Sequence, residues 1–198
     1  MKAERGPVSA LGFTVKSGWA CAVLVCGPAS SPRVMDTRRI ELSDPAVPES
    51  RQPYHAGFAT ARSRGPQLSR LVTSVERFGT RSVTELIRQY RKTGHTLQGT
   101  GIIVGSLIDP DTVGNEHIRI HALEGQLFRR VVDGAAARSR LARTIWRERD
   151  LYAFAADALK RPETQIKSRL TACGKDVAGP WRAEQKSATL AAWLVLAS

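Results

Sequence analysis

A continuous apolar segment near the middle of the chain constrains the fold more than any other feature. The run Gly101-Ile-Ile-Val-Gly-Ser-Leu-Ile108 ends at Asp109-Pro110. Such a run is typical of a strand at the centre of a sheet, because a strand with one face in water would alternate apolar and polar side chains. The sequence therefore predicts an α/β protein in which helices cover both faces of a sheet.

Three strands are expected ahead of this segment. Residues 8–15 are a short β-prone run, 16–18 form a turn, and 19–26 are a second apolar strand, which together predict a hairpin. Residues 33–42 alternate apolar and polar side chains, so we expect a third, antiparallel strand. The following stretch, 43–65, is rich in proline and poor in apolar residues, which indicates a long surface connection.

Helical patterns occupy most of the remaining chain. Between residues 68 and 90 the apolar spacing is helical but is interrupted at Gly79, and Ser82–Glu85 has the pattern of a capping box, so we expect two consecutive helices or one broken helix. A long helix is expected from about residue 115 to 137. The other expected elements are a short strand at 142–147, a helix at 151–159 capped by Asp150, a helical turn from Pro162 and a last helix from Pro180 through Leu196.

The charge of the chain indicates what it could attract. Thirty lysines and arginines against eighteen acidic residues give a formal net charge of +12, within a globular composition of 42% apolar and 24% charged residues. This charge would concentrate phosphates, nucleic acid or acidic protein surfaces near the molecule. A solvated basic surface without a specific partner would explain the same charge.

Cysteine usage and hydropathy indicate the compartment. Two of the three cysteines lie in one apolar strand, which suits a core and a reducing compartment better than a disulfide framework. The first thirty residues contain no signal-like apolar region, and no segment approaches about 20 consecutive apolar residues. We therefore expect a single cytoplasmic domain over residues 1–198, neither secreted nor inserted in a membrane.

The opening hairpin carries a resemblance to a known fold. Gly12-Phe-Thr-Val-Lys-Ser-Gly-Trp19, followed by two further strands, resembles the opening of the ribonuclease H-like superfamily, particularly its resolvase-like and actin-like branches, with Gly12, Gly18 and Trp19 carrying the match. The order of the expected elements is similar to that fold over most of the chain. The resemblance implies a five-stranded mixed sheet whose first three strands are antiparallel, with helices on both faces.

The acidic residues of the catalytic members of this superfamily are missing. In those members an Asp two residues after the glycine, a Glu near the end of the fourth strand and acidic residues of the last helix hold two Mg²⁺ ions. The corresponding positions here are Thr14 and Ser106, and Glu184 of the last helix stands near Lys186, which would repel a cation. The resemblance therefore implies a divergent member without the two-metal nuclease centre or the actin-like nucleotide-associated metal.

The long helix after the central strand carries polar groups in its apolar sector. At about 100° per residue, His117, His121 and Glu124 fall among the apolar positions that would face the sheet. Buried polar groups need partners or a cavity, and open α/β sheets bind ligands at the carboxyl ends of their strands. Three interpretations stay open: polar groups at a wet helix end, a catalytic site in which Glu124 fixes the tautomer of a histidine, or a metal bound by all three.

Other polar residues are expected near the same edge of the sheet. They come from the turn after the first strand, from the ends of the central and fifth strands, and from a Tyr-His pair in the long loop. A solvent-exposed hairpin turn and packing of one aromatic ring onto the domain explain these residues equally well. We expect Thr14, Ser106 and the ridge formed by His117, His121 and Glu124 to surround one hollow. The candidate ligand-binding residues are Lys16, Ser17, Asp109, Tyr54, His55 and Glu148.

Three functional hypotheses follow. The leading one is a ribonuclease H-like domain that binds a phosphate-bearing small molecule or nucleic acid without two-metal nuclease activity. The second is a hydrolase or transferase that uses the His/Glu site on the helix after the fourth strand, and the third is a protein-interaction scaffold. The sequence leaves open whether the protein is an enzyme, which cofactor or metal it uses, and its oligomeric state.

Overall fold

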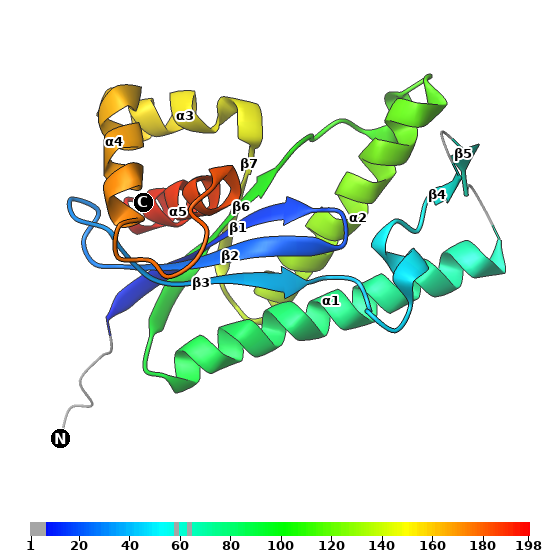
Figure 1. Ribbon diagram of the computed structural model, residues 1–198, viewed down its shortest axis with the longest axis horizontal. Helices are drawn as coiled ribbons and strands as arrows, with labels where there is room; N and C mark the ends of the chain where they lie inside the picture. Colours follow the sequence, from blue (N-terminus) through cyan, green and yellow to red (C-terminus); the bar gives the residue numbers. More distant parts are fainter. Residues whose placement is uncertain (1–6, 58–59, 63–64) are drawn as a thin grey trace.

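The computed structural model describes residues 7–57, 60–62 and 65–198. Its main strands are β1 (Val8–Lys16), β2 (Trp19–Cys26), β3 (Arg33–Glu41), β6 (Thr96–Val104) and β7 (Ala142–Arg147). They form one sheet in the order β3-β2-β1-β6-β7 (Figure 1). The pairs β1–β2 and β2–β3 are antiparallel, whereas β6 pairs parallel with β1 and with β7. The predicted five-stranded mixed sheet with three antiparallel strands first is confirmed.

Helices cover both faces of this sheet, as predicted. The helices are α1 (Pro66–Lys92), α2 (Glu116–Arg138), α3 (Leu151–Ala158), α4 (Glu163–Cys173) and α5 (Ala183–Leu196). Helices α1 and α2 pack together on one face, and α5 lies on the other with α3 and α4 beside it (Figure 1). The short elements are η1 (Pro48–Arg51), η2 (Pro110–Thr112), η3 (Glu148–Asp150) and a small separate sheet of β4 (His55–Gly57) and β5 (Thr60–Ala61).

The central strand begins and ends earlier in the chain than the sequence predicted. We expected residues 101–108, but β6 covers Thr96–Val104. Its pairing with β1 ends at Ile103 and its pairing with β7 ends at Val104, so the chain has no strand partner beyond that point. Leu107 and Ile108 are exposed in consequence. The end of the apolar run was therefore not a guide to the end of the strand.

The expected break at Gly79 does not occur, because α1 is one continuous helix. A Cβ on Gly79 would lie 2.6 Å from Val131 Cγ1 and 2.9 Å from the Leu42 carbonyl oxygen. The glycine permits α2 and the end of β3 to approach α1 closely. The capping-box pattern is likewise not a cap, since Glu85 lies inside the helix and pairs with Arg88 at 2.7 Å.

The C-terminal helices differ in detail from the prediction. Asp150 makes no side-chain cap of α3, and its carboxylate accepts a hydrogen bond from Arg147 Nε instead. The single helical turn expected after Pro162 is the longer helix α4. Cys21 and Cys26 are buried free thiols, as the core interpretation predicted. Within the described residues, no helix has the length and apolar character to cross a membrane.

The two faces of the sheet are packed at different distances from their helices. A Cβ on Gly12 would lie 1.7 Å from the Ala188 carbonyl oxygen, and one on Gly101 would lie 2.6 Å from that of Ala191. The backbone of α5 therefore rests directly on β1 and β6. On the other face, large buried side chains such as Phe13 and Phe128 fill the space between the sheet, α1 and α2.

Candidate functional site

A hollow of about 260 Å³ lies at the carboxyl ends of β1 and β6, the edge at which the sequence predicted a site. The turn after β1, the segment after β6 and the middle of α2 form its walls. Its floor is apolar and includes Val15, Val104 and Phe128. The polar side chains that line it belong to Lys16, Ser17, Ser106, His121, Gln126 and Arg129.

The lining of the hollow is basic. Among the described residues, no carboxylate lines it. Lys16 Nζ donates to Glu148 Oε2 at 3.1 Å, so this ion pair connects the carboxyl ends of β1 and β7 across β6, and both side chains are about one-third exposed. Arg129 takes part in no ion pair with the described residues. The site therefore offers two cationic side chains. Arg129 is unpaired with the described residues, and the charge of Lys16 is partly neutralised by Glu148.

Thr14 does not line this hollow, which corrects the expectation that it would. Successive residues of a strand point to opposite faces, and Thr14 points to the face that α5 covers. Its hydroxyl is buried and donates to the Glu184 carbonyl oxygen at 2.9 Å. Ser106 and His121 do share the hollow. The expected common hollow thus forms without its first-strand member.

Glu124 is buried and binds the long loop rather than a neighbouring histidine of its own helix. The Tyr54 backbone N–H donates to Glu124 Oε1 at 2.8 Å, and His55 Nδ1 lies 3.2 Å from the same oxygen. Burial raises the pKa of Glu124 to about 7, against the opposing effect of the hydrogen bonds from the loop. Burial also lowers the pKa of His55. Near neutral pH the environment therefore disfavours charge on both members of the pair.

A row of three imidazoles extends from this pair. The rings of His55 and His121 are edge to face with centroids 5.2 Å apart, and His121 Nε2 lies 3.3 Å from His117 Nε2. Burial, followed by the neighbouring His117 and His55, lowers the pKa of His121. His121 lines the hollow and also contacts His55, so it connects the hollow to the buried carboxylate of Glu124.

The three-ligand metal interpretation is wrong for this arrangement. In the described part of the chain, no group of three His, Cys, Asp or Glu side chains is placed to hold a metal ion. The i, i+4 spacing brings His117 and His121 together, but Glu124 points toward Tyr54 and His55. Glu124 was expected to orient His117 or His121, but its carboxylate contacts His55 of the loop instead.

The remaining predicted residues divide between the hollow and other roles. Asp109 does not line the hollow, because its carboxylate accepts from the Asp111 N–H at 3.1 Å and begins η2. Tyr54 packs against the main core. The sequence interpretation missed Gln126 and Arg129. A signal for Arg129 was present, since it follows His121 by eight residues, about two helical turns, on the same face.

Neither a protein-family model nor a curated protein matches the sequence. Among solved structures, the chain is similar to Thermus thermophilus RuvC, with a TM-score of 0.52 and 10% identity over 94% of this chain and 92% of that chain. It is also similar to T. thermophilus RuvC in complex with Holliday junction substrate, with a TM-score of 0.55 and 9% identity over 94% and 91%. The likeness confirms the ribonuclease H-like fold.

Proposed function

We propose that the chain is a ribonuclease H-like domain that binds a phosphate-bearing ligand, a nucleotide or nucleic acid, at the hollow, without two-metal nuclease chemistry. The observation that carries this proposal is the lining. Lys16, Arg129 and His121 stand there with the hydroxyls of Ser17 and Ser106. Among the described residues no carboxylate lines the hollow, and Glu148, which pairs with Lys16, lies outside the lining.

The chemistry of this lining suits a phosphate group. A guanidinium and an ammonium attract the negative charge, and hydroxyls donate to phosphate oxygens. The volume of about 260 Å³ is below the roughly 300–1,000 Å³ of pockets that enclose a whole small molecule, so one phosphate with part of its sugar is the expected occupant. The similar RuvC, determined with Holliday junction substrate, supports nucleic acid as the source of that phosphate.

The packing around Thr14 supports the absence of a two-metal centre. Two Mg²⁺ ions need several carboxylate oxygens that converge on one point. Thr14 instead presents a hydroxyl that is bound to the Glu184 backbone, and α5 lies too close to Gly12 for any added atom. We therefore assign binding to the hollow and no metal-dependent cleavage to the α5 face.

The test measures binding of a nucleoside monophosphate and of short DNA and RNA oligonucleotides at low ionic strength. We expect the double variant Lys16→Gln, Arg129→Gln to lose at least about tenfold in affinity for the monophosphate, because charge-assisted hydrogen bonds are lost. The matched control is Lys160→Gln, Lys175→Gln, which removes the same charge from the loops after α3 and α4. No association with any of these ligands at low salt contradicts the proposal.

A second candidate function, acid–base catalysis on a bound phosphate ester, is favoured by one specific observation. His121 lines the hollow and contacts His55, whose Nδ1 is 3.2 Å from Glu124. The carboxyl group of Glu124 contacts His55, and the His55 ring packs against His121. An imidazole held in this way at the hollow is suited to move a proton near neutral pH. This arrangement would let His121 act on a ligand while Glu124 and His55 position it.

This candidate is tested with model phosphate mono- and diesters. If His121 is the acid or base, His121→Ala lowers turnover by at least about 100-fold. Arg119→Ala is the control on the same helix, because Arg119 is exposed and does not line the hollow. Turnover that survives His121→Ala removes this residue from the mechanism and leaves the binding proposal intact.

A further inference from the structure

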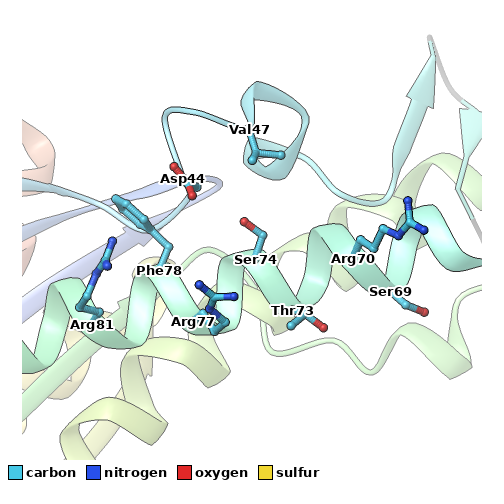
Figure 2. Close-up of a pocket in the computed structure, with 9 residues that line it drawn as sticks. All are labelled: Asp44, Val47, Ser69, Arg70, Thr73, Ser74, Arg77, Phe78 and Arg81. Atoms are coloured by element: carbon cyan, nitrogen blue, oxygen red, sulfur yellow. The ribbon is translucent and has the colours of Figure 1, made fainter.

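A groove of about 630 Å³ runs between α1 and the loop after β3, apart from the hollow. Figure 2 shows Asp44 and Val47 on the loop above the helix, with Arg70, Arg77 and Arg81 spaced along α1. Offsets of seven and four residues keep the three arginines within a narrow sector of the helix surface. From the first to the third, the rise along the helix is about 16 Å at 1.5 Å per residue.

The three arginines are available to a ligand. They are exposed, and none is in an ion pair with the described residues. The two carboxylates of α1 are already paired with other arginines, Glu76 with Arg130 at 3.1 Å and Glu85 with Arg88 at 2.7 Å. The positive charge of this row is therefore not neutralised by the acidic side chains of its own helix.

The other polar groups of the groove suit an anionic chain. Thr73 and Ser74 lie between Arg70 and Arg77 and add hydroxyl donors, and Ser69 lines the groove beside Arg70. Among the described residues one carboxylate lines the groove, that of Asp44, which accepts from the Ala46 N–H at 2.9 Å and is thereby held in its own turn. Three guanidiniums against one carboxylate leave the groove positive. The guanidinium of Arg81 also stacks over the Phe78 ring, at 5.3 Å from its centroid.

We infer that this groove binds the sugar–phosphate backbone of a nucleic acid. Guanidinium and hydroxyl groups supply most backbone contacts in protein–nucleic acid complexes, and they read no sequence. A span of about 16 Å corresponds to about five phosphates of one strand at 3.4 Å each along a duplex axis. An acidic protein partner would require apolar area at the centre of its interface, whereas Val47 and Phe78 are the only large apolar residues among the described ones that line this groove.

This site deepens the proposed function by naming an extended polymer as the ligand, but it does not share residues with the hollow. The two are therefore separable by probe. A nucleoside monophosphate carries one phosphate and reports on the hollow. A single-stranded or duplex DNA of about 20 nucleotides per strand spans far more than the five phosphates and reports on the groove.

The experiment uses the full chain and the triple variant Arg70→Gln, Arg77→Gln, Arg81→Gln. We expect its affinity for the oligonucleotide to fall at least 30-fold at 50 mM salt, and the slope of log K against log salt to decrease by about 2 to 3, the value for three lost phosphate contacts. Binding of the monophosphate stays within twofold. An unchanged melting temperature shows that the exposed substitutions leave the fold intact.

The control removes the same charge elsewhere, with Arg33→Gln, Lys160→Gln and Lys175→Gln, and is expected to lose less than threefold. Equal losses in the triple variant and the control overturn the inference, because net charge alone then explains binding. A triple variant that loses only its binding to phosphatidylserine vesicles, and keeps the oligonucleotide, overturns nucleic acid as the partner.

The inference and the proposed function fail in different ways. If the groove variant keeps oligonucleotide binding while Lys16→Gln, Arg129→Gln abolishes it, the groove is not a site and the hollow stands. If the groove variant loses the oligonucleotide while the hollow variant loses neither ligand, the groove stands and the hollow is not the phosphate site.

Discussion

The two faces of the central sheet are covered in different ways at the ends of β1 and β6. On one face, Gly12 and Gly101 let the backbone of α5 rest on the strands, and the Thr14 hydroxyl is bound to that helix. On the other face, Phe13 and Phe128 hold α2 away from the sheet, and the space at its open end is the basic hollow. One face is closed by backbone contact and the other is left open by large side chains.

This difference shows on which face of the sheet space remains at the ends of β1 and β6. The closed face includes the first-strand position at which the resemblance implies a catalytic carboxylate, and Thr14 occupies this position with its hydroxyl bound to α5. The open face retains polar groups that a sheet-covering helix does not need for packing, namely His121 and Glu124 of α2. The following predictions challenge the two descriptions separately.

The largest effect is expected from filling the closed face. Gly12→Ala places a Cβ where the Ala188 carbonyl oxygen already lies at 1.7 Å, so α5 must move and the free energy of unfolding should fall by at least about 3 kcal/mol. Gly134→Ala is the matched control, since only the end of the Arg138 side chain lies near it. In a helix that change should be neutral or stabilise by up to about 1 kcal/mol. Equal denaturation midpoints for the two variants contradict the closed packing.

On the open face, Glu124→Gln should change how stability depends on pH. Because burial raises the pKa of Glu124 to about 7, the folded state favours the protonated carboxyl, and its contribution is full below the unfolded value and lost as pH rises through 7. Glutamine cannot ionise and keeps an acceptor for the Tyr54 N–H. The stability of the variant relative to wild type should therefore increase by on the order of 2 kcal/mol between pH 5 and pH 8.

Urea denaturation at several pH values measures this effect. The exposed Glu163→Gln on α4 is the control and should show no comparable increase. The lowered pKa of His55 acts in the opposite sense, since its contribution is lost as pH falls. Because His55 Nδ1 contacts Glu124 Oε1 at 3.2 Å, the same comparison in a His55→Gln background isolates the effect of the carboxyl group. A flat difference between pH 5 and pH 8 would show that Glu124 is not held in a charge-disfavouring site.

The sequence predicted the fold well because the sheet depends on local patterns. A β-prone run and an apolar run located β1 and β2, alternation of apolar and polar side chains located β3, and helical spacing located α2. It failed where tertiary contact decides the outcome. Gly79 reads as a helix breaker, yet it permits close approach to Val131, and the apolar run after Val104 has no strand to pair with.

The sequence identified several residues of the candidate site but not which of them contact one another. Helical periodicity identified Glu124 as a polar group that needs a partner. The loop residues Tyr54 and His55 were candidates because a tyrosine and a histidine side by side in a polar loop can contact a ligand. No local pattern connects positions about 70 residues apart. Thr14 was placed in the hollow by analogy with an acidic residue, although the alternation of side chains along β1 turns it toward α5.

A smaller effect is expected from Thr14→Val, which removes the hydroxyl and keeps the shape. The lost hydrogen bond to the Glu184 carbonyl oxygen should cost about 1 kcal/mol in unfolding free energy. Phosphate-ligand affinity should stay within twofold, because Thr14 lies on the face that α5 covers. A variant that keeps its stability but loses ligand affinity would place Thr14 in the site and contradict the separation of the two faces.

The smallest change in stability is expected where the open face meets solvent. The ion pair between Lys16 and Glu148 is about one-third exposed, so Glu148→Gln should alter the unfolding free energy by no more than about 0.5 kcal/mol. Its effect on binding should be larger, because Lys16 is then free to contact a phosphate. We expect affinity for a nucleoside monophosphate to rise about two- to fivefold, equivalent to roughly 0.4–1 kcal/mol.

Net charge alone would give a similar direction, and the control distinguishes the two causes. Glu163→Gln raises the net charge equally, but on α4 and away from the hollow. A rise specific to Glu148→Gln assigns it to the release of Lys16, whereas equal rises assign it to the overall field. A fall in affinity would mean that Glu148 holds Lys16 in its binding position, because removing the partner would then cost orientation without a gain in charge.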